Sequence, residues 1–236
     1  MNNFVVPAPP IVALPIVGSS EHFPVRRVYC VGRNYAAHAR EMGFDPTRDP
    51  PFFFAKPADA VIPAHHGETR QIRYPSKSTN YQYEVELVAA IGRPAYKVST
   101  EQALDIIFGY AVGLDMTRRD LQLALRDKGR PWELGKAFDE SAPCGPIYSV
   151  AQHGHPASGG IWLQVDGADR QRSDITHLIW SVAEIVSNLS QYFRLVPGDI
   201  VFTGTPEGVG PVTPGQIMSA GIDGLGSITI AVAADE

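Results

Sequence analysis

Several features are scarce or missing in this chain, and each absence excludes a class of protein. Cysteine occurs only at Cys30 and Cys144, without a Cys-x-x-Cys pair or a signal peptide, which excludes a disulfide framework and favours a cytoplasmic protein. Proline breaks the apolar N-terminus at positions 7, 9, 10 and 15, so it falls short of the roughly 20 uninterrupted apolar residues of a transmembrane helix. The net charge of −5 lacks the basic excess of nucleic-acid binders.

The residues that are abundant indicate a globular protein with many short strands and turns. The hydrophobic fraction of 44% is enough for a core, whereas 22 glycines and 20 prolines disfavour long helices. Strands and short helices alternate irregularly, without a regular βαβ rhythm, which predicts an α+β protein with a mixed or antiparallel sheet. We expect residues 1–24 to form an extended arm and residues 25–236 to form a single domain.

Local patterns place the elements that matter most for a site. A hairpin turn is expected at Asp166-Gly167, where two strand-like segments meet. Short apolar runs bounded by glycine or proline predict strands over residues 27–32, 52–57, 81–92 and 109–114. Capping signals and apolar residues at helical spacing predict helices over residues 33–43, 99–107, 116–129 and 176–193.

Two acidic residues stand in the otherwise apolar strand YQYEVELVAAIG. Side chains at i and i+2 of a strand share a face, so Glu84 and Glu86 project together while Val85 projects away. Asp115 ends a second strand, and three hard oxygen ligands without cysteine suit Mg²⁺ or Mn²⁺ better than Zn²⁺. A solvent-facing acid pair explains the pattern equally well. However, two carboxylates in an apolar stretch repel each other and are costly to bury without a cation.

Other polar residues have two interpretations each. His38 and Glu41 are spaced i and i+3 on an expected helix, so the carboxylate could orient the imidazole to activate water. An exposed histidine beside a surface glutamate is the simpler interpretation of that spacing. Lys136, in the segment LGKAFD, could stabilise an enolate or a carboxylate, although a solvated loop lysine fits the pattern better. The turn TGTPEGVG could offer N–H groups to an anion but lacks the lysine of a phosphate loop.

In combination, the motifs of the chain resemble those of the fumarylacetoacetate hydrolase family. Each motif is moderately specific, and their ordered set spans roughly residues 27 to 230. The resemblance implies a mixed β-sandwich roll with few helices, usually assembled as a homodimer. The matching stretches are VGRNYAAHAREMG, FFFAKP, YEVELVAAIG, FGYAVGLDMTRRDLQ, GRPWELGKAFDESAPCGPI and PGDIVFTGTPEGVG.

The same resemblance implies roles for individual residues, including a lid that orders over the substrate and carries the His38 and Glu41 pair. It implies a centre that holds Mg²⁺ or Mn²⁺, a set of catalytic residues and a set of substrate-binding residues. The implied metal ligands are Glu84, Glu86 and Asp115. The implied catalytic residues are His38, Glu41 and Lys136. The implied substrate-binding residues are Arg119, Gln122, Thr205 and Tyr35.

The resemblance further implies hydrolysis of a carbon–carbon bond in a 2,4-dioxo acid, a small-molecule substrate. The short, bacterial-type chain fits enzymes that act on acylpyruvates, and QIRYPSKSTNYQYEVEL favours 3-fumarylpyruvate, from the gentisate route of aromatic breakdown. Another acylpyruvate, or decarboxylation of oxaloacetate at the same site, is the nearest alternative. A non-catalytic metal-binding module is an alternative from another class, and it would leave the lid pair and Lys136 without a task. No nucleic-acid or membrane partner is expected.

Overall fold

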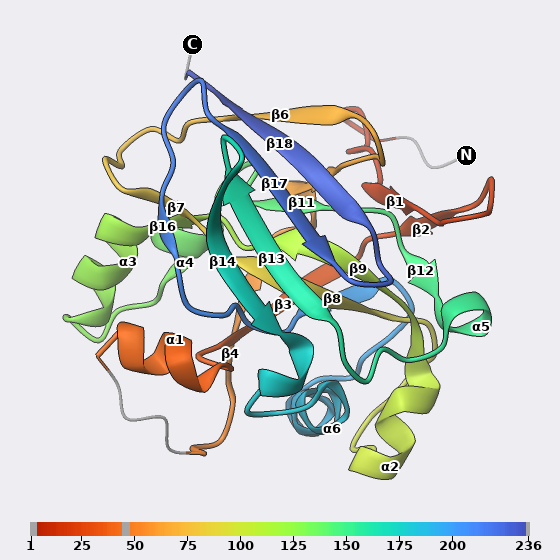
Figure 1. Cartoon of the computed structure of the whole chain (residues 1–236). Helices are drawn as coiled ribbons and strands as arrows, with labels where there is room; N and C mark the ends of the chain where they lie inside the picture. The colour runs from red at the N-terminus through yellow and green to blue at the C-terminus, as the bar shows by residue number, and fades with distance from the viewer. Residues whose placement is uncertain (1–3, 44–47, 235–236) are drawn as a thin grey trace.

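Two large β-sheets pack against each other and form the body of the molecule (Figure 1). The computed structural model describes residues 4–43 and 48–234. The larger sheet is mixed and has the strand order β4 (Phe52–Lys56), β3 (Arg27–Gly32), β15 (Asp199–Phe202), β8 (Val85–Ile91), β9 (Ile107–Leu114), β11 (Ala142–Cys144) and β5 (Val61–Pro63), with β12 (Tyr148–Ser149) paired to β9. The second sheet has the order β14 (Ala168–Asp174), β13 (Gly160–Val165), β17 (Ile217–Ile222), β18 (Ser227–Ala233) and β6 (Thr69–Arg73).

Small sheets and short helices complete the fold. The small sheets pair β10 (Thr117–Arg118), β7 (Tyr81–Tyr83) and β16 (Gly210–Pro211), and separately β1 (Ala13–Pro15) and β2 (His22–Pro24). The α-helices are α1 (Ala36–Glu41), α2 (Thr100–Ala103), α3 (Arg119–Arg126), α4 (Glu133–Lys136), α5 (Val150–His153) and α6 (Val182–Tyr192). The predicted α+β class, with mixed sheets and a few short helices, is confirmed. Within the described residues, no helix has the length and apolar character needed to cross a membrane.

Strand β8 is buried along its whole length because it lies between two apolar clusters. Val88 and Ala90 pack with apolar residues of β3 and β15 on one side of the larger sheet. Because side chains alternate along a strand, Glu84 and Glu86 extend this same face. The opposite face of the strand packs against β13, β17 and β18 of the second sheet, through Val85, Leu87, Ala89 and Ile91.

The predicted helices are present, but several of their ends are wrong. The helix expected over residues 116–129 begins at Arg119, because Thr117–Arg118 pair with β7 instead. The α-helix expected to reach residue 107 ends at Ala103, and a 3₁₀ turn over Leu104–Ile106 leads into β9. The expected hairpin turn between β13 and β14 is confirmed, and both of its residues have positive φ, 50° at Asp166 and 79° at Gly167.

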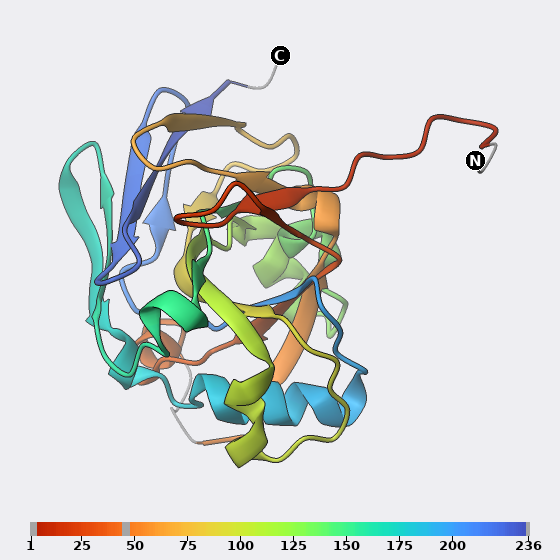
Figure 2. The same ribbon diagram turned by 90° about the vertical axis from the view of Figure 1, so that its right-hand side faces the viewer.

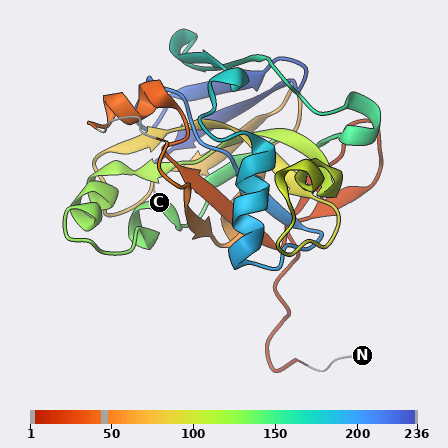
Figure 3. The same cartoon turned by 90° about the horizontal axis from the view of Figure 1, so that it is seen from below.

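The N-terminal segment has two parts. Residues 4–12 carry no regular secondary structure and lead away from the body of the molecule (Figures 2 and 3). Strands β1 and β2 then pair as a hairpin, and Leu14 and Phe23 are buried in the same apolar cluster as β3. The arm boundary at residue 24 stays a prediction, since this hairpin lies within the expected arm.

Candidate active site

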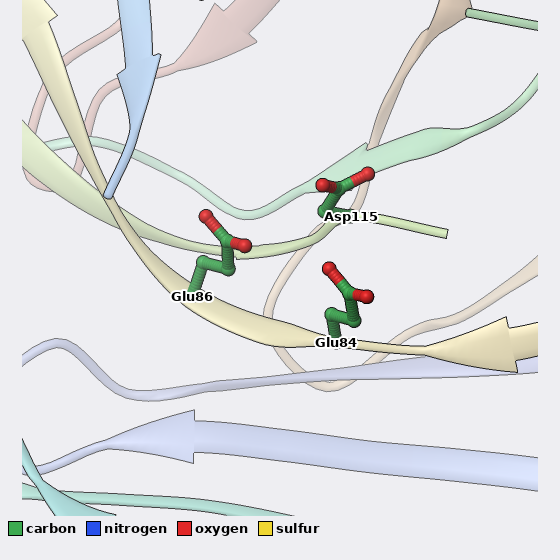
Figure 4. A group of neighbouring side chains, drawn as sticks. All are labelled: Glu84, Glu86 and Asp115. Carbon is green, nitrogen blue, oxygen red and sulfur yellow. The ribbon is translucent and has the colours of Figure 1, made fainter. Parts of the chain in front are cut away.

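Three buried carboxylates meet where β8 and β9 pair (Figure 4). Glu84 directly precedes β8, Glu86 lies within it, and Asp115 directly follows β9. The antiparallel register sets Val85 opposite Leu114, and the Asp115 N–H donates to the Glu84 carbonyl at 2.9 Å. This register brings ligand oxygens of all three acids within 4.8 Å of one another, in residues that are at most 5% exposed.

The ammonium group of Lys136 lies between two of these carboxylates. Lys136 is the last residue of α4 and is buried. Its Nζ donates to Glu84 Oε2 at 2.7 Å, to Asp115 Oδ2 at 2.8 Å and to Thr117 Oγ1 at 2.7 Å. Burial lowers the pKa of Lys136, but the neighbouring carboxylates of Asp115 and Glu84 outweigh burial and raise this pKa overall. The lysine is therefore a fixed positive charge at the site.

Glu84 receives a second cation from α3. The Arg119 guanidinium donates from Nη2 to Glu84 Oε1, from Nε to Gln82 Oε1 at 2.8 Å and from Nη1 to Gln122 Oε1 at 2.5 Å. Burial raises the pKa of Glu84, but the charges of Lys136 and Arg119 outweigh burial and hold this pKa well below its usual range. Glu84 is consequently a carboxylate at neutral pH.

Asp115 is flanked on its other side by Lys56, the last residue of β4. The Lys56 side chain is fully buried, and its Nζ lies 2.8 Å from Asp115 Oδ1. Lys56 Nζ donates its hydrogen bonds to the backbone oxygens of Met116, at 3.2 Å, and of Lys136. Within the described residues, Asp115 Oδ1 is left in an ion pair but without a hydrogen-bond donor. This buried oxygen can therefore accept a further cation.

Glu86 differs from its two neighbours because no lysine or arginine forms an ion pair with it in the part of the chain that the structure describes. Its Oε2 accepts a hydrogen bond from the Gly204 N–H at 2.7 Å. Gly204 has a φ of 101°, and a Cβ at this position would lie 2.6 Å from the Asn34 side chain. Burial, followed by the charges of Asp115 and Glu84, raises the pKa of Glu86 well above its usual value. A divalent cation would offset this repulsion, so the donor set fits Mg²⁺ or Mn²⁺.

The second predicted pair of residues lies on the short helix α1. His38 Nδ1 is 3.2 Å from Glu41 Oε2, and the Gly208 N–H donates to both Glu41 oxygens, at 3.1 and 3.2 Å. Gly208 has φ of 88°, and a Cβ there would lie 2.1 Å from the Arg170 carbonyl oxygen, so this donor requires glycine. Burial raises the pKa of Glu41, but the hydrogen bonds from His38 and Gly208 outweigh burial and lower it.

One pocket connects the His38 side chain with the carboxylates. Glu84, Glu86 and Lys136 line it together with His38, although they come from three separate parts of the chain. The imidazole of His38 and two of the three carboxylates therefore line the same space. Among the described residues, the rest of the lining is Val31, Gly32, Arg33, Phe52, Phe54, Gln122, Arg126, Trp132 and Thr205.

The four residues expected to bind substrate are placed differently. Thr205 and Gln122 line the pocket, and Thr205 Oγ1 donates to the Val85 carbonyl at 2.8 Å. Arg119 is directed at Glu84 and Gln122 instead of at the pocket. Tyr35 is 1% exposed, and neither it nor Arg119 belongs to the described pocket lining. Substrate binding by these four residues stays a prediction.

Two residues that hold the site together were missed in the sequence. Lys56 falls in the motif FFFAKP, where a lysine at the end of an aromatic strand is a usable signal of a buried cation. Gln171 is completely buried, and its side chain accepts the Val85 N–H at 3.0 Å and donates to Thr205 Oγ1 at 2.9 Å. No local signal marks Gln171, because charged and exposed residues surround it in β14.

The fold and the donor set fit a class of metal-dependent enzyme with a small pocket beside a buried Glu-Glu-Asp group. The chain belongs to the fumarylacetoacetate hydrolase family. The family model described as the fumarylacetoacetate (FAA) hydrolase C-terminal region matches residues 27–233. The resemblance inferred from the motifs is thereby confirmed.

Individual relatives lie close to this chain in sequence and structure. A fumarylpyruvate hydrolase from Ralstonia sp is 46% identical over 181 residues, covering 77% of this chain and 92% of the relative. A mitochondrial oxaloacetate tautomerase from Arabidopsis thaliana is 41% identical over 202 residues, covering 86% and 88%. A solved structure similar to this one is that of fumarylpyruvate hydrolase from Pseudomonas aeruginosa in complex with Mn²⁺ and pyruvate. Its sequence is 62% identical, the TM-score is 0.97, and the match covers 99% of this chain and 100% of that chain.

Proposed function

We propose that this chain hydrolyses a carbon–carbon bond of a 2,4-dioxo acid, with 3-fumarylpyruvate as substrate and fumarate and pyruvate as products. The observation that carries the proposal is the shared pocket, in which His38 faces the buried centre of Glu84, Glu86 and Lys136. The similarity to fumarylpyruvate hydrolases from Ralstonia sp and Pseudomonas aeruginosa supports the choice of substrate.

The buried centre would bind the pyruvoyl end of the substrate. Mg²⁺ or Mn²⁺ held by Glu84, Glu86 and Asp115 supplies a Lewis acid that polarises a carbonyl oxygen and stabilises enolate charge. The Mn²⁺ and pyruvate complex of the Pseudomonas aeruginosa relative supports this assignment. Lys136 adds a positive charge at the same end, although its ammonium protons already donate to Glu84, Asp115 and Thr117. It would act on the substrate through its charge.

His38 would provide the base. With the proton on Nδ1, His38 would donate a hydrogen bond to Glu41 Oε2, and Nε2 would be the acceptor for a proton from water. The resulting hydroxide attacks C4 of the substrate, and the C3–C4 bond breaks. Its electron pair goes to C3 as the enolate of pyruvate, and the acyl part leaves as fumarate. The enolate then takes a proton at C3, so water is the only co-reactant.

A reaction on oxaloacetate is a second candidate, because the relative from Arabidopsis thaliana is an oxaloacetate tautomerase. Decarboxylation of oxaloacetate would use the same metal and the same stabilisation of an enolate but no attacking water. Loss of the His38 and Glu41 side chains should then reduce hydrolysis far more than decarboxylation. Hydrolysis of a different acylpyruvate would need the same residues and would change only the acyl group. A non-catalytic metal-binding module gives no use for His38 in the pocket.

Location, assembly and pathway are further proposals. The two unpaired, buried cysteines, Cys30 and Cys144, support a cytoplasmic enzyme. The family resemblance supports a homodimer, and the donor set accommodates Mg²⁺ as well as Mn²⁺. With 3-fumarylpyruvate as substrate, the enzyme would serve the gentisate route of aromatic catabolism. Light scattering of the purified protein would test the dimer directly.

An ultraviolet assay of 3-fumarylpyruvate, with acetylpyruvate and oxaloacetate in parallel, tests the proposed reaction. We expect Mg²⁺- or Mn²⁺-dependent loss of the enol absorbance and equimolar fumarate and pyruvate, with the highest kcat/KM for 3-fumarylpyruvate. EDTA should stop the reaction, and added metal should restore it. A higher kcat/KM for oxaloacetate would overturn the proposed substrate, and no turnover of any of the three would support the binding module.

A further inference from the structure

Two arginine side chains line the pocket without a role in the mechanism above, Arg33 and Arg126. Both are half-buried, whereas the carboxylates at the metal centre are buried. Among the described residues that line this pocket, Glu84 and Glu86 are the only acids, and both belong to the centre. The part of the pocket formed by the arginines is therefore positively charged and suited to an anion.

Helix α3 sets the distance of Arg126 from the metal centre. Arg119, Gln122 and Arg126 follow i, i+3, i+7 spacing, so they lie along one face of the helix. Arg119, at the start, contacts Glu84, and Gln122 accepts a hydrogen bond from Arg119 while lining the pocket. With a rise of about 1.5 Å per residue, Arg126 stands roughly 10 Å further along the helix axis than Arg119. One helix face thus leads from the centre to the cationic part.

Arg33 occupies a backbone position that does not favour arginine. Its φ is 59°, in the left-handed region where a residue with a Cβ is strained. Its guanidinium lies 5.4 Å from the centre of the Phe52 ring. The Phe52 ring packs directly on Gly32, and its centre lies 5.3 Å from the centre of the Trp132 ring in an edge-on arrangement. The aromatic surface that supports the Arg33 guanidinium is therefore held in place. Strain at a pocket residue with a supported side chain indicates a functional constraint.

The two guanidinium groups also act on each other. Burial, followed by the charge of Arg126, lowers the pKa of Arg33. Both groups have other interactions in the protein, and Arg126 pairs with Asp127 at 2.9 Å. Asp127 is 65% exposed, so this pair is largely in solvent and is weak. An anion held in the pocket would reduce the repulsion between the two arginines and accept their N–H groups.

We propose that Arg33 and Arg126 bind the distal carboxylate of a dianionic acylpyruvate and so select this substrate class. The inference rests on the proposed function and identifies the part of the site that would recognise the acyl group. In 3-fumarylpyruvate the two carboxylates are six bonds apart, and the trans double bond prevents the second from folding back onto the first. When the pyruvoyl end lies at the metal centre, the distal carboxylate extends away from it. Arginine is suited to that end because its fork of N–H donors matches a carboxylate.

Substrate discrimination by arginine variants tests the proposal. For Arg126→Met we expect kcat/KM for 3-fumarylpyruvate to fall roughly 10- to 100-fold, the size of a lost charged hydrogen bond, while kcat/KM for acetylpyruvate changes less than about twofold. Arg33→Asn, which tolerates the left-handed backbone, should behave in the same way. Arg130→Met is the matched control, because it removes an exposed positive charge just after α3 that does not line the pocket. It should leave both substrates unchanged.

A binding experiment separates recognition from catalysis. With Mn²⁺ and saturating pyruvate present, fumarate and crotonate are titrated calorimetrically, since crotonate replaces only the distal carboxylate by a methyl group. The wild type should bind fumarate at least about tenfold more tightly, and Arg126→Met should remove the difference. Equal affinity of the wild type for the two probes, or equal losses on both substrates in the variants, would overturn the distal subsite while acylpyruvate hydrolysis stands. Failure of the wild type to hydrolyse any acylpyruvate would instead overturn the proposed function.

Discussion

Glu84 and Glu86 of the carboxylate centre line the same pocket as His38 of the His38–Glu41 pair, but the chain supports the centre and the pair in opposite ways. Glu86 lies in β8, and Glu84 and Asp115 directly adjoin β8 and β9, which are central strands of the larger sheet. There β8 is hydrogen-bonded to β9 on one side and to β15 on the other. The pair lies on α1, which has six residues and no side-chain cap. Its Glu41 is tied to the rest of the site through the Gly208 N–H.

This difference matches the two tasks proposed for these regions, metal binding and proton transfer. A metal centre needs oxygen atoms at fixed positions, and strands with buried counter-charges hold them there. A base that receives a substrate and releases products benefits from a support that can open, and a short helix with few anchors is such a support. The prediction that α1 forms part of a lid is consistent with this arrangement. Perturbing each region should therefore give different signatures in stability, metal affinity and turnover.

The largest effect on metal affinity and turnover is expected from a change in the carboxylate centre. Glu86→Gln removes a ligand charge, and we expect Mn²⁺ affinity to fall at least about 100-fold, because even residues that only orient ligands cost roughly 10- to 100-fold. Turnover of 3-fumarylpyruvate should become undetectable at metal concentrations that saturate the wild type. Metal titration by calorimetry and the ultraviolet assay measure the two effects. Glu101→Gln, at an exposed position in α2, is the control, and unchanged metal affinity in Glu86→Gln would remove this residue from the centre.

The next largest effect concerns the base. His38→Ala should lower kcat for hydrolysis by roughly 10²- to 10⁴-fold, as is usual for a lost general base, with Mn²⁺ affinity unchanged. Steady-state kinetics together with metal titration would show this separation. Retention of most of the turnover would contradict the role of His38. A parallel loss of metal affinity would instead show that the two regions are not independent.

How much of the site was visible in the sequence depends on the range of the interaction. Period-two alternation placed Glu84 and Glu86 on one face, because this is a property of the strand alone. The position of Asp115 beside Glu84 depends on the register between β8 and β9, which no local pattern specifies. The i, i+3 spacing of His38 and Glu41 predicted their contact but not the Gly208 N–H, which arrives from a distant turn. The motif resemblance supplied what the local patterns could not.

The fold shows the same limit. The α+β class and the hairpin turn at Asp166-Gly167 follow from composition and turn chemistry, and both are confirmed. Helix ends were wrong where a neighbouring strand competes for the backbone, as at Thr117–Arg118, which pairs with β7. Gln171 was invisible because its burial results from packing between sheets and not from its exposed neighbours along β14.

The next effect in size concerns the free energy of unfolding, which should depend on the carboxylate centre more than on the His38–Glu41 pair. Lys56→Met leaves Asp115 without one of its buried counter-charges. Loss of one partner of a buried pair typically lowers the free energy of unfolding by about 3 to 5 kcal/mol. Urea unfolding of the Mn²⁺-free protein would measure the change. Lys128→Met, in the exposed loop after α3, is the matched control and should change stability by less than about 0.5 kcal/mol.

Metal removal should have an effect that depends on pH. Because the folded state raises the pKa of Glu86, its contribution to the stability of the metal-free protein is complete below the ordinary glutamate pKa of about 4.3 and is lost as the pH rises through the raised value. Metal binding requires the ionised form and gains strength over the same range. The Tm difference between Mn²⁺-loaded and EDTA-treated protein should therefore be larger at about pH 8 than at about pH 5.5. An equal difference at both pH values would contradict this.

The smallest effect should come from the support of the base. Glu41→Gln keeps the length of the side chain but replaces its charge-assisted hydrogen bond to His38. We expect kcat for hydrolysis to fall by about tenfold, the value of a modest charged hydrogen bond, with the free energy of unfolding and Mn²⁺ affinity nearly unchanged. Arg40→Gln, on an exposed position of the same helix, should leave kcat intact. A loss of stability as large as that of Lys56→Met would mean that α1 is as firmly built into the fold as the carboxylate centre, and the contrast between the two regions would fail.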